Sequence, residues 1–170
     1  MTDTALDRPD VIVFPPLIPL ATLVLACVLQ WLVPLGWIAG LEPPVRIGIG
    51  AIIALSGLVT TSAGRRALIK HGTNVSPSQP ATQLVTDGVF GHTRNPLYVG
   101  GSIALCGLAL IFDLDWILLL IVPSCALLHF AVVRREERYL EQKFGDAYRH
   151  YKARVPRYFA GNGKRIRKTS

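Results

Sequence analysis

Charged residues are scarce in this sequence: they make up 17% of the 170 residues, whereas hydrophobic residues make up 51%. A typical soluble domain carries about 25% charged residues. The sequence also lacks a nucleotide-binding glycine motif in a strand–helix setting, a P-loop, and the H-E-x-x-H and C-x-x-C spacings. The three cysteines, Cys27, Cys106 and Cys125, lie in apolar stretches without a metal-ligand spacing. We therefore expect buried structural thiols and no metal site.

Four long windows contain no Asp, Glu, Lys or Arg, and they cover residues 11–41, 47–64, 95–112 and 116–133. A membrane-spanning helix needs roughly 17–25 such residues. The alternative is a helical hairpin in a soluble core, but four windows leave too little polar surface to cover that core. The sequence therefore predicts one all-α domain, residues 1–170, built as an integral membrane bundle of about four transmembrane helices.

The windows and the polar stretches between them divide the chain into segments. Residues 1–10 form an N-terminal tail, residues 11–133 hold the transmembrane helices with a cytoplasmic loop at 65–94, and residues 134–170 form a cytoplasmic C-terminal segment. The last apolar window runs into polar residues 134–144 without a helix breaker. We expect one long helix that leaves the membrane, a C-cap at Gly145, and a short helix that ends before Pro156.

The distribution of basic residues predicts the orientation. With four spans, 17 of the 18 Lys and Arg residues fall on the side that holds both termini, and only Arg46 falls on the other. Cytoplasmic loops carry such an excess, so we expect both termini in the cytoplasm and the protein in a bacterial-type inner membrane. The net charge of +7 then reflects topology and attraction to lipid rather than nucleic-acid binding.

Two polar clusters lie where cytoplasmic helix ends meet the membrane. The first is Arg94-Asn95-Pro96, in which Pro96 suits the first turn of a helix and Asn95 its N-cap. A helix start beside an arginine makes an anion site, although a capped helix with a snorkelling arginine is an equal alternative. The second is Glu136-Glu137, which could line a pocket or belong to a solvated, salt-bridged helix face.

An ordered series of short blocks resembles the isoprenylcysteine carboxyl methyltransferase and phospholipid methyltransferase superfamily of membrane enzymes. The resemblance covers about half of the chain, from Gly72 to Arg157. The blocks are Gly72-Thr73-Asn74-Val75-Ser76-Pro77, Leu84-Val85-Thr86-Asp87-Gly88-Val89-Phe90, Thr93-Arg94-Asn95-Pro96-Leu97-Tyr98-Val99-Gly100, and Glu136-Glu137 with the spaced residues Leu140, Phe144, Gly145, Tyr148, Tyr151, Val155, Pro156 and Arg157.

This resemblance implies a methyltransferase that binds S-adenosylmethionine without a Rossmann domain and methylates a lipidic or amphipathic acceptor. It implies catalytic roles for Arg94 and Glu137. The cofactor-binding residues that it implies are Leu84, Val85, Gly88, His92, Asn95, Tyr98, Gly100 and Glu136.

Two departures from the family pattern leave the acceptor open, either a carboxylate or an amine. Many relatives have His where this chain has Asn95, and isoprenylcysteine enzymes usually have Arg where it has Val132. For an amine acceptor, Glu137 or His92 is the nearest general base. The alternatives are a sterol-type membrane reductase that uses NADPH, and a non-catalytic small membrane protein on the same scaffold.

Overall fold

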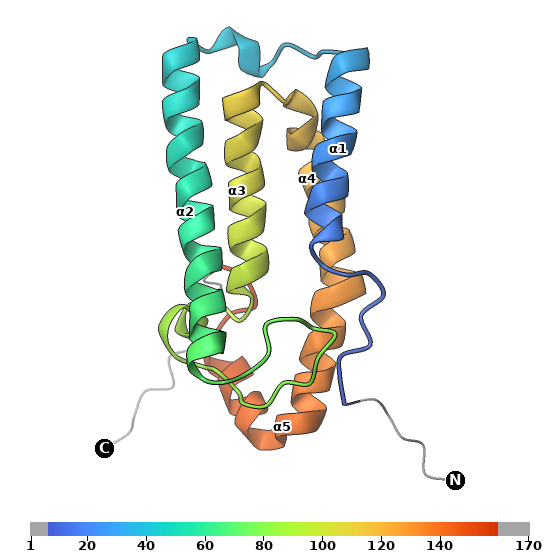
Figure 1. Cartoon of the computed structure of the whole chain (residues 1–170), viewed down its shortest axis with the longest axis vertical. Coiled ribbons are helices and arrows are strands. Elements are labelled where there is room, and N and C mark those ends of the chain that lie inside the picture. Colours follow the sequence, from blue (N-terminus) through green and yellow to red (C-terminus); the bar gives the residue numbers. More distant parts are fainter. Residues whose placement is uncertain (1–6, 160–170) are drawn as a thin grey trace.

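The computed structural model describes residues 7–159. The outer ends of the predicted N-terminal tail and C-terminal segment, residues 1–6 and 160–170, lie outside the described residues. The described chain is helical and contains no strand (Figure 1), which confirms the all-α prediction. Its α-helices are α1 (Leu17–Leu32), α2 (Pro43–Lys70), α3 (Pro96–Phe112), α4 (Asp115–Leu128) and α5 (Arg134–Arg154). Three short turns of other helix types are η1 (Ile38–Gly40), η2 (Gly88–Gly91) and η3 (His129–Val133).

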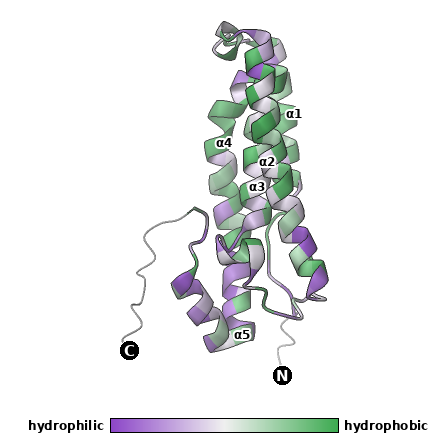
Figure 2. Cartoon of the chain, turned by 90° about the vertical axis from the view of Figure 1, so that its left-hand side faces the viewer, coloured by the Kyte–Doolittle hydropathy of each residue, from purple (hydrophilic) through white to green (hydrophobic). Residues whose placement is uncertain are grey.

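Helices α1 to α4 stand side by side and form an apolar bundle, with the polar α5 below it (Figures 1 and 2). Two helices are long and apolar enough to cross a membrane, namely α2 and the continuous helix Asp115–Arg154, while α1 and α3 are shorter apolar helices. Large hydrophobic side chains are exposed on the outside of the bundle, including Trp31, Ile52 and Val122. Apolar surface of this extent is typical of contact with lipid, and the predicted membrane bundle is confirmed.

Glycines allow α2 and α3 to pack with their backbones in contact. A Cβ atom on Gly57 would lie 2.5 Å from the carbonyl oxygen of Gly100, and one on Gly107 would lie 2.6 Å from that of Gly50. No side chain fits into so little space, so these positions need glycine. In lipid, where helices associate through packing rather than through hydrophobic burial, such close approach is a main source of stability.

A buried aspartate fixes the end of the bundle that is distant from α5. Asp115, at the start of α4, is completely buried and accepts hydrogen bonds from the backbone N–H groups of Gly36 and Ile38, both at 2.8 Å. The side chain of Gln30 donates a third bond at 3.2 Å. The carboxylate thus replaces the water that these backbone donors would otherwise bind, and it connects α1 to α4.

Helix α2 is longer than its apolar window, which corrects the predicted loop boundary. The helix continues to Lys70, so the loop begins at His71 rather than at Arg65. No glycine or proline stands between Arg65 and Gly72, and Gly72 adopts a positive φ of 66°. The expected long fourth helix is present, and it contains a π-helical turn at η3. It kinks at Gly145, where φ is 52°, a backbone conformation that favours glycine.

Candidate active site

A pocket lies below the start of α3, where the bundle meets α5. Its walls come from the loop after α2, the first turn of α3, the buried face of α5 and the N-terminal segment at Pro9. Its cavity volume is about 130 Å³, and the pocket opens to solvent.

The pocket brings together the two polar clusters that are far apart in the sequence. Seven of the ten predicted site residues line it: Leu84, Val85, Arg94, Asn95, Tyr98, Glu136 and Glu137. Arg94 and Asn95 precede α3, whereas the glutamates stand in the first turn of α5. Both clusters therefore face one cavity, as an active site requires.

The other three predicted residues, Gly88, His92 and Gly100, are not on the pocket wall. Gly88 is exposed and forms a turn with a φ of 56°. His92 is exposed, and its Nδ1 lies 3.2 Å from the carbonyl oxygen of Gly88. Gly100 is buried against α2, where a Cβ would lie 2.6 Å from the carbonyl oxygen of Gly57. Contact of these three residues with a cofactor stays a prediction.

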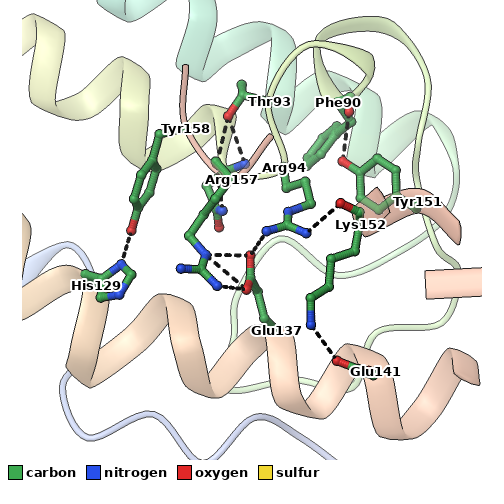
Figure 3. Close-up of polar contacts among 11 residues, drawn as sticks. Phe90, Thr93, Arg94, His129, Glu137, Glu141, Tyr151, Lys152, Arg157 and Tyr158 are labelled. Carbon is green, nitrogen blue, oxygen red and sulfur yellow. Dashed lines mark hydrogen bonds and ion pairs between the residues drawn. The ribbon is translucent and has the colours of Figure 1, made fainter. Parts of the chain in front are cut away.

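Glu137 is held between two arginines (Figure 3). Arg94 Nη2 lies 2.9 Å from Glu137 Oε1, and the side chains of this pair are only 7% and 8% exposed. Arg157 contributes a fork, with Nε at 3.0 Å from both carboxylate oxygens and Nη2 at 2.6 Å from Oε2. Such charge-assisted, bidentate contacts are among the strongest in proteins. They occupy both oxygens of Glu137 and fix the position of Arg94.

The C-terminal segment completes this cluster. Thr93 Oγ1 and Asn95 Nδ2 both donate to the carbonyl oxygen of Arg157, each at 3.0 Å. The hydroxyl of Tyr158 is hydrogen-bonded to His129 Nδ1 at 2.8 Å (Figure 3). Asn95 occupies the N-cap position of α3, but its side chain makes no capping bond, which corrects the predicted capping role. The amide is instead committed to Arg157, whose place in the site sequence reasoning missed.

Glu136 differs from its neighbour because no cation pairs with it in the described part of the chain. The Tyr98 hydroxyl donates to its Oε1 at 2.6 Å. Burial is the main cause that raises the pKa of the Glu136 carboxyl, to about 7, and the nearby charge of Glu137 adds to the increase. The hydrogen bond from Tyr98 acts in the opposite direction. Glu136 thus presents a carboxyl group to the pocket that can change protonation near neutral pH.

One nitrogen of the Arg94 guanidinium has no hydrogen-bond partner among the described residues. This atom, Nε, is buried. Because buried polar groups are rarely left without a partner, such an atom in a pocket wall indicates a place for a ligand acceptor. The described residues contain no group of three or more His, Cys, Asp and Glu side chains that could hold a metal ion.

A second, apolar cavity adjoins the pocket on the side of the bundle. The two share Leu97 and Tyr98, together with the loop residues Val75, Ser76 and Pro77. The second cavity extends between α1, α3 and α4 to Leu105 and Ile121, and Arg65 is the charged residue on its wall. An apolar chamber within the bundle thus opens beside a polar pocket at its end.

The described chain is thus a helical bundle of membrane type with a pocket at one end that adjoins an apolar chamber. The model of one family, phospholipid methyltransferase, matches residues 45–147, more than half of the chain. The chain belongs to this family. The match begins in α2, before the first block of the sequence resemblance, and it covers α3, α4 and most of α5.

Curated proteins with detectable similarity carry different names. The protein-S-isoprenylcysteine O-methyltransferase of Schizosaccharomyces pombe is 37% identical over 74 residues, which are 43% of this chain and 31% of that protein. The nickel-cobalt-cadmium resistance protein NccN of Alcaligenes xylosoxydans xylosoxydans is 30% identical over 79 residues, 46% of this chain and 37% of that protein.

The cobalt-zinc-cadmium resistance protein CzcN of Cupriavidus metallidurans is 32% identical over 76 residues, 45% of this chain and 35% of that protein. The matched part of the chain therefore spans about a third of the length of these relatives. No solved structure matches the chain significantly.

Proposed function

We propose that the protein transfers a methyl group from S-adenosylmethionine to a lipidic or amphipathic acceptor at the cytoplasmic face of the membrane. The observation that carries the proposal is the convergence of two clusters, Arg94-Asn95 and Glu136-Glu137, on one pocket. Membership of the phospholipid methyltransferase family supports methyl transfer as the reaction. The distribution of basic residues supports the cytoplasmic side.

The residues of the pocket fit the charges of this methyl donor, which carries a carboxylate, an ammonium and a sulfonium. The buried Nε–H of Arg94 lacks an acceptor, and a ligand carboxylate supplies one. The Glu136 carboxylate, which has no cationic partner in the described chain, suits an ammonium group. When bound, the donor supplies an electrophilic methyl group on its sulfonium.

The two glutamates then have different tasks. Glu137 is saturated by Arg94 and Arg157, so it acts as a positioning residue that holds Arg94 in place. Glu136 lines the pocket, only its Oε1 has a hydrogen-bond partner among the described residues, and its pKa is raised to about 7. These properties suit a group that binds an amine or accepts a proton. Geometry therefore favours Glu136 over Glu137 or His92 as a proton acceptor.

The apolar chamber supports an acceptor with a long hydrocarbon portion. Such a chain would lie among apolar residues between the helices, and its polar end would reach the pocket beside Leu97 and Tyr98. Holding the acceptor atom in line with the methyl group accounts for much of the rate in such transfers. The surrounding apolar wall also removes water from the nucleophile.

Methyl transfer is tested by incubating the purified protein with membrane lipid extract and methyl-labelled S-adenosylmethionine, followed by mass spectrometry of the lipids. The proposal expects a labelled lipid with the wild type and a strong reduction with Glu136→Gln. Arg66→Ala, an exposed change at the end of α2, is the control and should keep activity. A labelled product of equal yield without the protein, or none with any lipid fraction, argues against the proposal.

A further inference from the structure

The N-terminal segment of residues 7–16, here called the strap, is fastened along α5 and the π-helical turn. The backbone N–H of Ile12 donates to the carbonyl oxygen of Ala131 at 3.1 Å. Asp7 accepts from Lys143 Nζ at 2.6 Å, and Asp10 pairs with Arg135 at 2.9 Å. These contacts hold the strap beside α5, along which the N-terminal segment runs in Figure 1.

An open hollow lies between the strap and α5. It is outside the pocket that Arg94 and Glu136 line, which we call the methyl-donor pocket after the proposed function. We call it the arginine hollow, because Arg8, Arg135 and Arg138 line it, with Val11 and Phe14 on the side toward the bundle. Asp10 is the one acidic residue on its wall. Three positive charges against one negative charge give the hollow a net attraction for anions.

Two of its arginines have no carboxylate partner in the part of the chain that the structure describes. Arg8 and Arg138 are exposed, and the side chain of Arg138 donates only to the carbonyl oxygen of Arg134 in its own helix. Arg135 is engaged by Asp10, whose side chain is almost fully exposed. Arg8 and Arg138 are therefore available to bind an anion from outside the chain.

The apolar side of the arginine hollow indicates what kind of anion the hollow binds. Phe14 is 50% exposed, and Leu17, at the start of α1, is 52% exposed, so an apolar surface leads from the hollow up the outside of the bundle. A soluble anion makes no apolar contact with that surface, whereas an acyl chain can pack against it. We propose that the arginine hollow binds the phosphate of an anionic phospholipid, with the acyl chains along the start of α1.

The arginine hollow lies next to the methyl-donor pocket, but lipid binding in the hollow does not depend on methyl transfer. Pro9 and Tyr139 line both the hollow and the pocket. A phosphate bound to Arg8 from the strap and to Arg138 from α5 joins these two elements across the pocket edge. Bound anionic lipid thus holds the strap against α5 at the edge of the pocket.

The proposal is tested with the purified full-length protein in neutral detergent, titrated with short-chain phosphatidylglycerol and with short-chain phosphatidylcholine. We expect tighter binding of phosphatidylglycerol. Each basic residue near an anionic lipid surface contributes about 1 kcal/mol, a factor of roughly five in affinity. Arg8→Ala with Arg138→Ala should therefore weaken phosphatidylglycerol binding about 25-fold, while Asp10→Asn should strengthen it.

Arg66→Ala is the matched control, because Arg66 is an exposed arginine at the same end of the bundle but outside the hollow. It should bind phosphatidylglycerol like the wild type. Equal loss in this control would mean diffuse attraction and would overturn the proposal. So would equal affinity for the two lipids, or glycerophosphate binding as tightly as the lipid, which would indicate a site for a soluble anion. Circular dichroism of each variant checks that it is folded.

Discussion

Removing the Glu137 carboxylate should destabilise the protein more than any other single charge deletion on α5. In Glu137→Ala, Arg94 loses its partner while its side chain remains 7% exposed, and Arg157 loses its fork. Breaking a buried ion pair by removing one member costs about 3–5 kcal/mol, because the other charge stays buried. Arg157, at 34% exposed, can turn to water, so we expect the lower end, about 3 kcal/mol.

Equilibrium unfolding in mixed detergent and SDS micelles, followed by circular dichroism, measures this loss in free energy. Glu141→Ala is the matched control, since Glu141 lies one turn further along α5 and also pairs with two cations, Arg149 and Lys152. That cluster is on the surface and its loss should leave stability close to that of the wild type. Equal stability of the Glu137 and Glu141 variants would refute the reasoning, because burial would then make no difference.

Three further predictions concern other parts of the molecule. Affinity for S-adenosylhomocysteine in calorimetry should increase as pH rises through about 7, because the raised pKa of Glu136 leaves its carboxyl neutral below that value; Glu136→Gln should bind weakly at every pH. Gly100→Ala should lower the free energy of unfolding by about 1–3 kcal/mol through overpacking against α2, whereas Gly101→Ala, with no neighbour within 4 Å, should not. Asp115→Ala should cost about 1.5–3 kcal/mol for each charged hydrogen bond lost, measured by the same unfolding assay.

Much of the fold follows from the sequence because lipid imposes simple rules. Uncharged windows of sufficient length predict helices, and the absence of a breaker after residue 133 predicts the continuous helix from α4 into α5. The uncharged window ends at Gly64, but α2 continues to Lys70, since a helix can continue past the membrane with charged side chains at Arg65 and Arg66 in water. Charge alone does not end a helix; Gly72 does.

The site was predictable in part. The resemblance places Arg94 and the glutamates together, but it does not distinguish Glu136 from Glu137, because neighbouring residues on a helix differ only in what surrounds them. The role of Arg157 depends on how the C-terminal segment folds back, with Thr93 and Asn95 holding its carbonyl oxygen. Its position at the end of the last block was the one available signal. For Gly100 the sequence does not separate two roles, because a glycine that packs helices resembles one that contacts a ligand, and its contact with a cofactor stays a prediction.

The most direct test of the central claim is calorimetric titration of the purified protein with S-adenosylhomocysteine and, separately, with NADPH. The account predicts that S-adenosylhomocysteine binds, that NADPH does not, and that Arg94→Ala and Glu136→Gln each weaken binding about tenfold or more, as the loss of a charged hydrogen bond implies. Binding of NADPH alone, or wild-type affinity for S-adenosylhomocysteine in both variants, would contradict it.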